Sequence, residues 1–377
     1  MGARVLAAMS GGVDSSVAAA LLLEQGYEVI GVTMQLWPKD LPIHHDGGCC
    51  SLSAVEDARR VAKVLGIPYY VLNFQEIFAR EVIDAFTGEY LRGRTPNPCI
   101  RCNDRVKFGA LLEKARELDA DYVATGHYAR VSYDPERGRY LLLKAVDEAK
   151  DQTYALYGLT QEQLAHCLFP LGPYRKEETR RMARDRGLPV ASKRESQDIC
   201  FIPDRDLAGF LERQVPGAAR PGPIVNRRGE VLGTHQGAFR YTVGQRKGLG
   251  IAAGEPLYVL EVDVEQNRLV VGTREELYGH ALEVEGLNWI AFPDLAEPVE
   301  CQAKIRYRAA DAPALVEPAG PGRATVRFRQ PQRAITPGQS VVFYQDDLVL
   351  GGGVIARPLP GRNEAPLEPA TPAAQEP

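Results

Sequence analysis

The segment AAMSGGVDSS (residues 7–16) combines residue types that suit a phosphate-binding loop, although it lacks the lysine of a Walker-type loop. The Ser-Gly-Gly run at residues 10–12 would let the backbone approach a polyanion without Cβ clashes. A helix that begins directly after it would aim free N–H groups and its dipole at the same point. Asp14 would repel phosphates unless Mg²⁺ bridges them, and Ser15 is placed as a hydroxyl donor. A plain helix N-cap is the alternative, but the position after a first strand favours nucleotide binding.

A second reactive group is the CxxC pair Cys99 and Cys102 in RTPNPCIRCNDRVKFG. Pro96 and Pro98 predict an extended loop that cannot join a helix. Basic side chains flank the pair: Arg92, Arg94, Arg101, Arg105 and Lys107. Nearby cations lower the pKa of a thiol and attract phosphates, which favours a reactive thiol. The alternative is half of a structural zinc site; HHDGGCC (residues 44–50) would then supply the other ligands, and otherwise we take it as an active-site loop.

A further cysteine, Cys200, lies in ESQDICFIP. A single cysteine beside Ile199 and Phe201 is typically a small buried hydrophobic residue. Its neighbours favour catalysis instead; they are Lys193, Arg194, Gln197 and Asp198. We take Cys167 and Cys301 as structural.

Length and composition exclude several classes of protein. A chain of 377 residues with 45% hydrophobic and 25% charged residues is typical of a soluble protein with two or three domains. We find no apolar run long enough to span a bilayer and no signal peptide, so we expect a cytoplasmic protein without membrane contact. In a reducing compartment, the seven cysteines would be catalytic, metal-binding or inert rather than disulfide-bonded.

Strand and helix signals alternate over the first third of the chain. Apolar runs predict strands at 5–9, 27–34, 68–72 and 122–125, and helical spacing predicts helices at 15–25 and 55–65. This alternation predicts a doubly wound parallel sheet covered on both faces. Ligands of such sheets bind at the carboxyl ends of strands, where both the opening loop and ATGHYA (residues 124–129) are expected to lie.

The rest of the chain changes character. Helical spacing recurs at 164–168 and 177–186, Gly and Pro are dense over 215–254, and short strands are predicted at 257–262, 269–272, 299–307, 324–328 and 340–344. Such strands favour a small barrel or sandwich. We predict an α/β ATP-binding catalytic domain at 1–205, a small mixed or β central domain that binds nucleic acid at 206–280, a C-terminal β-barrel at 281–357 and a disordered tail at 358–377.

Two resemblances make these predictions specific. SGGVDSS is similar to the signature of the PP-loop ATP pyrophosphatases, which have an adenine nucleotide alpha-hydrolase-like fold and cut ATP between its α- and β-phosphates. In that family the loop grips the departing pyrophosphate, so no γ-phosphate lysine is needed. Motifs from all three regions resemble the bacterial tRNA-specific 2-thiouridylases and follow that family's order between residues 4 and 356: AAMSGGVDSSVAA, TPNPCIRCNDRVKFG, DYVATGHYAR, KDQTYALYGL, SQDICFI, HQGAFRYTVGQRKGLG, IRYRAADAPA and AITPGQSVVFY.

The second resemblance implies roles for individual residues. It places the ATP phosphates against Ala8, Met9, Ser10, Gly11, Gly12, Val13, Asp14 and Ser15, and the adenosine against Met34 and Gly126. It implies contacts to the target base by Asn97, Pro98 and Cys99, and to tRNA by His127, Lys150, Asp151, Gln152, Arg306, Tyr307 and Gln339. Cys102 would be the nucleophile that works with the persulfide cysteine, Cys200. Because Cys99 stands where some family members carry Asp, a thiolate would replace any carboxylate base there.

The implied reaction starts with adenylation of the 2-oxygen of the wobble uridine, in tRNAs for Lys, Glu and Gln, by ATP with Mg²⁺. Sulfur from a Cys200 persulfide, loaded by an upstream sulfur carrier or cysteine desulfurase, would then displace AMP. Either the persulfide attacks directly, or Cys102 attacks it, releases sulfide and forms a disulfide. The alternative is a [4Fe–4S] cluster held by Cys99, Cys102 and Cys200 with one open iron site. We expect the chain to act as a monomer.

Local basic runs compensate for a net charge of −4, which does not by itself indicate nucleic acid. The runs are Arg180, Arg181, Arg184, Arg186, Lys193 and Arg194; Arg227, Arg228, Arg240, Arg246 and Lys247; and Lys304, Arg306 and Arg308. The last three alternate on an expected strand and should share one face. A single run is typical of a solvated face, but three beside an adenylating core favour a tRNA surface.

Two other functions fit parts of the sequence. Another adenylating enzyme with the same loop, such as an amidotransferase-like synthetase or a 4-thiouridine synthetase, would be expected to carry a glutaminase partner domain or an N-terminal RNA-binding domain. The loop at residue 10 leaves no room for the latter. A zinc-stabilised RNA-binding adaptor that holds ATP as a structural ligand would contain zinc and release no pyrophosphate.

Overall fold

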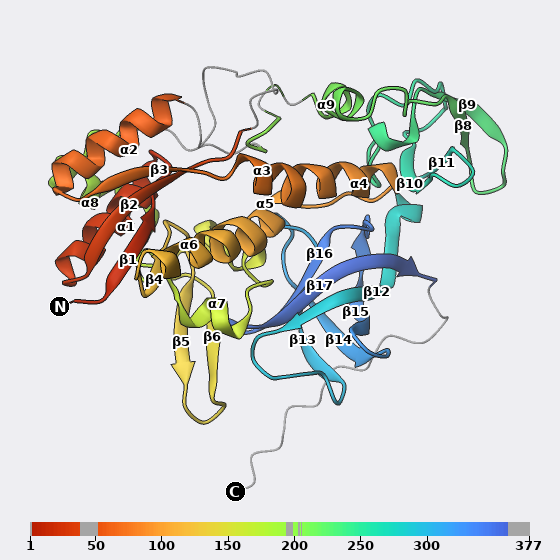
Figure 1. Cartoon of the computed structure of the whole chain (residues 1–377). Helices are drawn as coiled ribbons and strands as arrows, with labels where there is room; N and C mark the ends of the chain where they lie inside the picture. Colours follow the sequence, from red (N-terminus) through yellow and green to blue (C-terminus); the bar gives the residue numbers. More distant parts are fainter. Residues whose placement is uncertain (1, 38–51, 194–198, 203, 205, 361–377) are drawn as a thin grey trace, which may run out of the picture.

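The computed structural model describes residues 2–37, 52–193, 199–202, 204 and 206–360. The HHDGGCC segment, with the zinc ligands and active-site loop expected there, lies outside the described residues, as do Arg194, Gln197 and Asp198. Figure 1 shows an α/β part, a small β part and a β-barrel in chain order. None of the helices within the described ranges is long and apolar enough to cross a membrane.

The α/β part is built on a five-stranded parallel sheet in the order β3-β2-β1-β4-β7. Its strands are β1 (Arg4–Ala8), β2 (Glu28–Gln35), β3 (Tyr69–Asn73), β4 (Tyr122–Ala124) and β7 (Cys167–Leu168). Successive residues of β1 enter different apolar clusters, Leu6 on one face and Val5 and Ala7 on the other. Both faces are therefore covered, and the predicted doubly wound fold is confirmed.

Two groups of helices provide this cover (Figure 1). The first group packs through Val17, Val61 and Ala183 and consists of α1 (Val13–Glu24), α2 (Leu52–Leu65) and α8 (Lys176–Asp185). The second group follows β3 and precedes β4 in the sequence. It consists of α3 (Gln75–Phe78), α4 (Ala85–Leu91), α5 (Pro98–Arg101) and α6 (Leu111–Glu117), with π-helical segments at Ala79–Asp84 and Cys102–Ala110. Two short helices, α7 (Gln161–Ala165) and α9 (Leu207–Gln214), follow later in the chain.

The remaining strands form two further sheets. The central one has the order β10-β11-β8-β9 and contains β8 (Gly222–Val225), β9 (Val231–His235), β10 (Tyr258–Asp263) and β11 (Arg268–Gly272). The barrel contains β12 (Tyr278–Trp289), β13 (Val299–Lys304), β14 (Ala312–Pro318), β15 (Arg323–Arg333), β16 (Ser340–Gln345) and β17 (Leu348–Leu359). It closes because β12 pairs with both β15 and β17, which confirms the predicted barrel and leaves its strands without open edges.

A hairpin of the α/β part extends the barrel sheet. This hairpin consists of β5 (Arg130–Asp134) and β6 (Arg139–Leu143), and β6 pairs with β17. The Arg139 guanidinium donates to the carbonyls of Trp289 and Ile290 at 3.1 and 2.9 Å. The barrel is therefore joined to the α/β part by main-chain as well as side-chain contacts.

Several sequence predictions of local structure were wrong. The helix expected at 164–168 ends at Ala165, and the next apolar residues form β7 at the edge of the parallel sheet. The strand expected at 299–307 ends at Lys304, so Arg306 and Arg308 do not continue its alternation. β17 continues through Leu359, two residues into the segment for which we expected disorder. In each case tertiary pairing, which a local pattern cannot encode, sets where the element ends.

Candidate active site

The phosphate loop connects β1 to α1 and is ordered by its own hydroxyl groups. The Ser10 amide donates to Ser15 Oγ at 3.2 Å, and Ser16 Oγ donates to the Gly12 carbonyl at 2.7 Å. Ser15 Oγ also lies 3.3 Å from the Gly12 carbonyl oxygen, and Ser15 is only 6% exposed. Its hydroxyl therefore shapes the loop in this structure, whereas the sequence suggested a donor to phosphate.

Two glycines allow close backbone packing around this loop. Gly11 has φ +67°, and a Cβ there would lie 2.2 Å from the Ala54 carbonyl oxygen at the start of α2. A Cβ on Gly126 would lie 2.6 Å from the amide nitrogen of Ser15. The ATGHYA segment therefore packs directly on the first turn of α1. Met34 is the penultimate residue of the neighbouring strand β2 and is 9% exposed. The residues expected around the nucleotide therefore share the carboxyl edge of the sheet.

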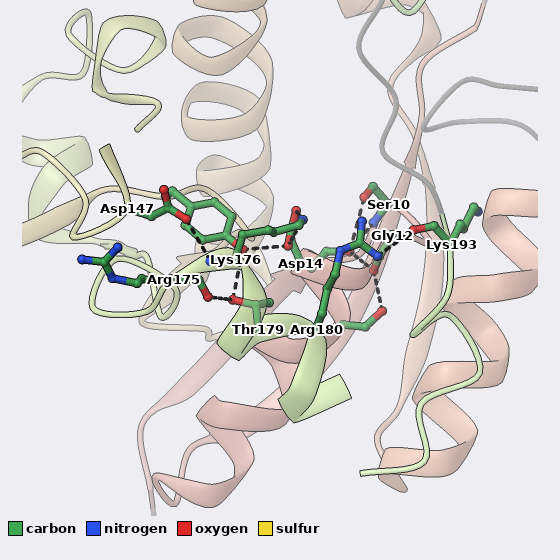
Figure 2. Close-up of polar contacts among 12 residues, drawn as sticks. Ser10, Gly12, Asp14, Asp147, Arg175, Lys176, Thr179, Arg180 and Lys193 are labelled. Carbon is green, nitrogen blue, oxygen red and sulfur yellow. Dashed lines mark hydrogen bonds and ion pairs between the residues drawn. The ribbon is translucent and has the colours of Figure 1, made fainter. Parts of the chain in front are cut away.

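A lysine that the loop lacks is supplied by α8 (Figure 2). Lys176 Nζ lies 2.7 and 2.8 Å from the two carboxylate oxygens of Asp14, and the Lys176 side chain is 7% exposed. The Tyr128 hydroxyl donates to Asp14 Oδ1 at 3.0 Å and lies 3.0 Å from Thr179 Oγ1. The Lys176 amide donates to Asp147 Oδ2 at 2.9 Å, which fixes the backbone as well. Sequence reasoning missed Lys176, because its separation from the loop leaves no local signal.

A second lysine holds the outer side of the loop. Lys193 Nζ donates to the Gly11 carbonyl at 3.0 Å and to Asp57 Oδ2 at 2.6 Å. Although burial acts to raise the pKa of Asp57, hydrogen bonds from Lys193 and Arg60 hold it below its usual value. Arg180 donates to the Lys193 carbonyl, and Arg186 forms an ion pair with Glu24. Three members of the first basic run therefore make internal contacts, and the tRNA surface expected from this run stays a prediction.

The cysteine pair lies at the start of a helix, contrary to the extended loop predicted from its prolines. Pro98 is the first residue of α5, a position that proline tolerates because no helical N–H is lost there. Asn97 caps the helix, and its Oδ1 accepts from the Cys99 amide at 3.1 Å. Cys99 is exposed on this first turn, whereas Cys102 is 8% exposed and belongs to the main apolar cluster.

Cys200 borders the same apolar cluster as Cys102. Its neighbour Phe201 packs edge-on against Phe78 and Phe86, with ring centroids 5.9 and 5.2 Å apart. Both cysteines that the resemblance pairs therefore contact this cluster, which extends through the α/β part, the central part and the barrel. By contrast, burial raises the pKa of the Cys301 thiol to about 12 and that of Cys167 further still, which fits their expected structural roles.

Carboxylates neutralise several cations that flank the cysteine pair. Arg94 bridges Glu89 and Glu285 at 2.7 Å each, and Arg101 pairs with Glu81 at 3.2 Å. These contacts differ from the expectation that the arginines act on the thiols. Within the described residues, which include Cys99, Cys102 and Cys200, no three His, Cys, Asp or Glu side chains are placed to hold a metal ion.

The barrel docks on the loop that precedes Cys99. The Thr95 amide donates to the Pro337 carbonyl at 2.8 Å, and Gln339 Nε2 donates to the Thr95 carbonyl at 2.6 Å. A Cβ on Gly338, whose φ is +88°, would lie 2.8 Å from the Thr95 nitrogen. The barrel therefore fixes the backbone just before the residues expected to meet the target base.

Tyr307 brings several expected tRNA residues together. It is 42% exposed, and its ring centroid lies 6.0 Å from that of Tyr154. Burial raises the pKa of Tyr307, with a further increase from Asp151 and a decrease from Lys150. Lys150, Asp151 and Cys99 therefore lie near Tyr307, and we call the surface around Tyr307, where the barrel meets the α/β part, the junction surface.

The other expected tRNA residues make internal contacts. Gln152 Oε1 accepts from the Tyr128 amide at 2.9 Å, and Asp151 accepts from Thr153 and the Ala145 amide. His127 lies 2.7 Å from Thr125 Oγ1, and burial holds its pKa well below the usual value, so its imidazole is neutral. Arg306 Nη2 donates to the Arg333 carbonyl at 2.8 Å. Their tRNA contacts stay predictions.

The site defines a class of protein. A doubly wound sheet with a glycine-rich loop between β1 and α1, and with cations gathered on that loop, is a nucleotide-binding domain of the PP-loop type. Family models match three consecutive regions: a tRNA methyl transferase HUP domain over residues 3–204, a tRNA methyl transferase PRC-barrel domain over 208–273 and an aminomethyltransferase beta-barrel domain over 279–355.

Curated relatives specify the family. The tRNA-specific 2-thiouridylase MnmA of Symbiobacterium thermophilum is 58% identical over 359 residues, which cover 94% of this chain and 92% of that protein. The protein of the same name from Moorella thermoacetica is 57% identical over 351 residues, covering 93% and 98%. The chain belongs to the MnmA family of tRNA-specific 2-thiouridylases, as its motifs implied.

The packing around Gly11 predicts that replacing it by alanine destabilises the fold more than the same substitution at the adjacent Gly12. Gly11→Ala should lower the free energy of unfolding by more than about 1–2 kcal/mol, the cost of the left-handed backbone alone, because the methyl group also meets the Ala54 carbonyl. Gly12→Ala is the matched control, since its nearest contact is Ser10 Oγ at 3.4 Å, and it should cost under about 1 kcal/mol. Urea denaturation of both variants measures this; equal losses would contradict the packing argument.

Asp104 is a second residue that the sequence did not single out. Its burial predicts that the free energy of unfolding depends on pH. Burial raises its pKa to about 6, although Arg105 and Arg101 oppose the shift. The pKa of Asp104 is higher in the folded state than in the unfolded state. The contribution of this carboxyl group to the free energy of unfolding is therefore complete below about pH 4 and is lost as the pH rises to about 6. Asp104→Asn should therefore gain up to about 2–3 kcal/mol relative to the wild type across this window and stay level above it.

Denaturation of the wild type and Asp104→Asn from pH 4 to pH 8 tests this prediction. Glu113→Gln, at an exposed position on α6, is the control and should follow the wild type. A constant difference between Asp104→Asn and the wild type at every pH would show that Asp104 stays ionised.

Proposed function

We propose that the chain is a tRNA-uridine 2-sulfurtransferase that acts as a monomer in the cytoplasm. It uses ATP and sulfur from a cysteine persulfide to convert the wobble uridine of tRNAs for Lys, Glu and Gln to 2-thiouridine. The observation that supports this most directly is the phosphate loop between β1 and α1, against which Gly126 packs, with Met34 near the end of the neighbouring strand. These residues share the carboxyl edge of the parallel sheet, where a nucleotide is expected to bind.

The first step activates the uridine. Its 2-oxygen attacks the α-phosphate of ATP, an α-phosphate oxygen bond breaks, and pyrophosphate leaves. The N–H groups of residues 11–14 and the dipole of α1 stabilise the charge on the departing pyrophosphate. Asp14 supplies the hard oxygen ligands that suit Mg²⁺, and its side chain is 30% exposed. Bound there, Mg²⁺ would neutralise phosphate charge.

The second step replaces the adenylated oxygen by sulfur. A sulfur carrier or cysteine desulfurase first loads Cys200 as a persulfide. Cys102 attacks the Cys200 sulfur, a Cys102–Cys200 disulfide forms, and the released sulfide adds to the activated carbon and expels AMP; direct attack by the persulfide on that carbon is the alternative. A cellular thiol reductant then supplies two electrons to reopen the disulfide. A [4Fe–4S] cluster held by Cys99, Cys102 and Cys200 is the alternative source of sulfur in this proposal.

The junction surface supplies the tRNA contacts in this proposal. Asn97, Pro98 and Cys99 would meet the flipped base, with Lys150 and Tyr307 beside them. The central domain and the barrel would follow the anticodon stem with their basic residues. His127, Asp151, Gln152 and Gln339 would act by holding the segments around this surface, given their internal contacts.

Nucleoside mass spectrometry tests the function. Unmodified glutamate tRNA would be incubated anaerobically with the protein, ATP, Mg²⁺ and a persulfide source. We expect a wobble uridine heavier by one oxygen-to-sulfur exchange, absent with Cys200→Ala. Cys301→Ala is the matched control, because that thiol is partly buried in the barrel and its pKa is raised; it should leave the product unchanged.

Other products would point elsewhere. A methylated nucleoside would support a methyl transferase, the term in two of the matching family models. Thiolation that survives Cys200→Ala when sulfide is supplied would move sulfur delivery to free sulfide or to a cluster. ATP cleaved to AMP without any tRNA thiolation would remove the uridine assignment and leave the PP-loop class.

Arg306 gives a prediction for the tRNA surface. Burial and the nearby Arg333 lower the pKa of Arg306, so a phosphate would relieve an unfavourable pair of cations. Arg306→Ala should weaken tRNA binding about tenfold and reduce the slope of log affinity against log salt by about one. Arg329→Ala, whose guanidinium pairs with Glu300 at 2.8 Å, is the control. Filter binding across a salt series measures both variants; an unchanged slope for Arg306→Ala would remove it from the interface.

A further inference from the structure

The buried ion pair between Lys176 and Asp14 is more than the fold requires. Asp14 lies in the first turn of α1, where the helix dipole already stabilises an anion. Burying an ammonium costs several kcal/mol in desolvation, and an ion pair with a carboxylate offsets that cost at best. The ion pair therefore offers the fold little net gain over a site with neither charge, and stability alone does not explain why the ammonium is there.

The side chain of Lys176 is held in place by three separate elements. α8 carries it and packs on α1, Asp147 accepts from its amide at 2.9 Å, and the ring of Tyr128 lies 5.7 Å from its ammonium nitrogen (Figure 2). The other lysine at the loop, Lys193, donates to the Gly11 carbonyl and to Asp57, so its contacts stabilise the loop itself. Lys176 instead contacts Asp14, the residue beside which the phosphates are expected.

We propose that Lys176 is the pyrophosphate-binding cation of this enzyme, a lysine supplied by α8 in place of the one that the loop lacks. In the protein without nucleotide, Asp14 holds the ammonium at the phosphate site. If Asp14 held a divalent cation, its carboxylate would be neutralised, and the Lys176 ammonium would be released to pair with phosphate oxygens. The proposal rests on the proposed function, because it assumes that pyrophosphate is the leaving group.

Titration calorimetry with inorganic pyrophosphate, with and without MgCl₂, tests the proposal without requiring catalysis. Lys176→Met should raise the Kd of pyrophosphate about 10- to 100-fold, the effect of losing one charge-assisted hydrogen bond. AMP is the second probe, and its Kd should change less because it carries no β-phosphate. Lys114→Met is the matched control; that lysine pairs with Glu117 at 2.6 Å on the exposed face of α6, and its loss should leave both affinities unchanged.

A double variant separates ligand binding from charge neutralisation. Lys176→Met leaves the partly buried Asp14 carboxylate without its cationic partner and is expected to lower the melting temperature. Asp14→Asn combined with Lys176→Met removes both charges and should regain that stability but not the affinity for pyrophosphate. Asp14→Asn alone should bind pyrophosphate at least as tightly as the wild type in the absence of MgCl₂, since the ammonium is no longer held by a carboxylate.

The outcomes are distinguishable. If the double variant binds pyrophosphate like the wild type, Lys176 neutralises Asp14 and nothing more, and the proposal is overturned while the proposed function stands. If the wild type itself does not bind pyrophosphate, the PP-loop function fails first. If Lys176→Met does not fold, the double variant and Lys176→Arg, which keeps the charge and should retain most of the affinity, still decide the question.

Discussion

One continuous apolar cluster joins the three parts of the molecule, and the reactive residues take their positions from it. It contains Leu6 from the parallel sheet, Phe239 from the central part and Tyr344 from the barrel. Cys102 is a member, and Cys200 packs against it. Each large apolar side chain buried in such a cluster stabilises the fold by about 1.5–3 kcal/mol. Separating the parts would expose several of them at once, so the domains that the sequence suggests share one core and hold the site as a unit.

Hydrogen bonds fix the orientation of the barrel, which apolar packing alone does not determine. Tyr154 donates to the Ser340 carbonyl at 2.8 Å, and Tyr157 Oη lies 3.0 Å from Ser340 Oγ, so the segment beside Lys150 is tied to the start of β16. Both tyrosines are almost fully buried, and an unpaired hydroxyl there would be costly. Hydrogen bonds of this kind select one orientation of the barrel among the many that apolar burial alone would allow. These hydrogen bonds therefore fix the position of the barrel relative to the α/β part, and with it the surface around Tyr307.

The fold was predictable where patterns are local. The alternation of apolar runs and helical spacing over residues 1–125 was enough for the doubly wound sheet, because each βα unit carries its own signal. The phosphate loop was recognisable because its glycines and first helical turn are contiguous. β7 was missed because two residues carry no periodicity; the parallel pairing with β4 makes them a strand. The turn of Arg306 away from the line of Lys304 is likewise decided by barrel geometry, not by alternation.

The site was predictable to the extent that motifs list its residues, but not in its electrostatics. Cations in a sequence reveal nothing of their partners: Arg94 and Arg101 looked like neighbours of the thiols, yet glutamates from other elements neutralise them. Lys176 looked like one more charge on an amphipathic helix, yet it is among the most buried charged side chains of the chain. Such pairings depend on contacts between distant segments, which neither spacing nor composition records.

Chain connectivity adds a further constraint on the chemistry. The segment that follows β7 contributes Lys176 to Asp14, Lys193 to the Gly11 carbonyl and, a few residues later, Cys200. The cations at the phosphate loop and the cysteine that we propose as the sulfur carrier therefore belong to one stretch of the sequence. The Lys193 contact attaches that stretch to the main chain of the loop, so the loop and the segment that carries its cations are positioned together.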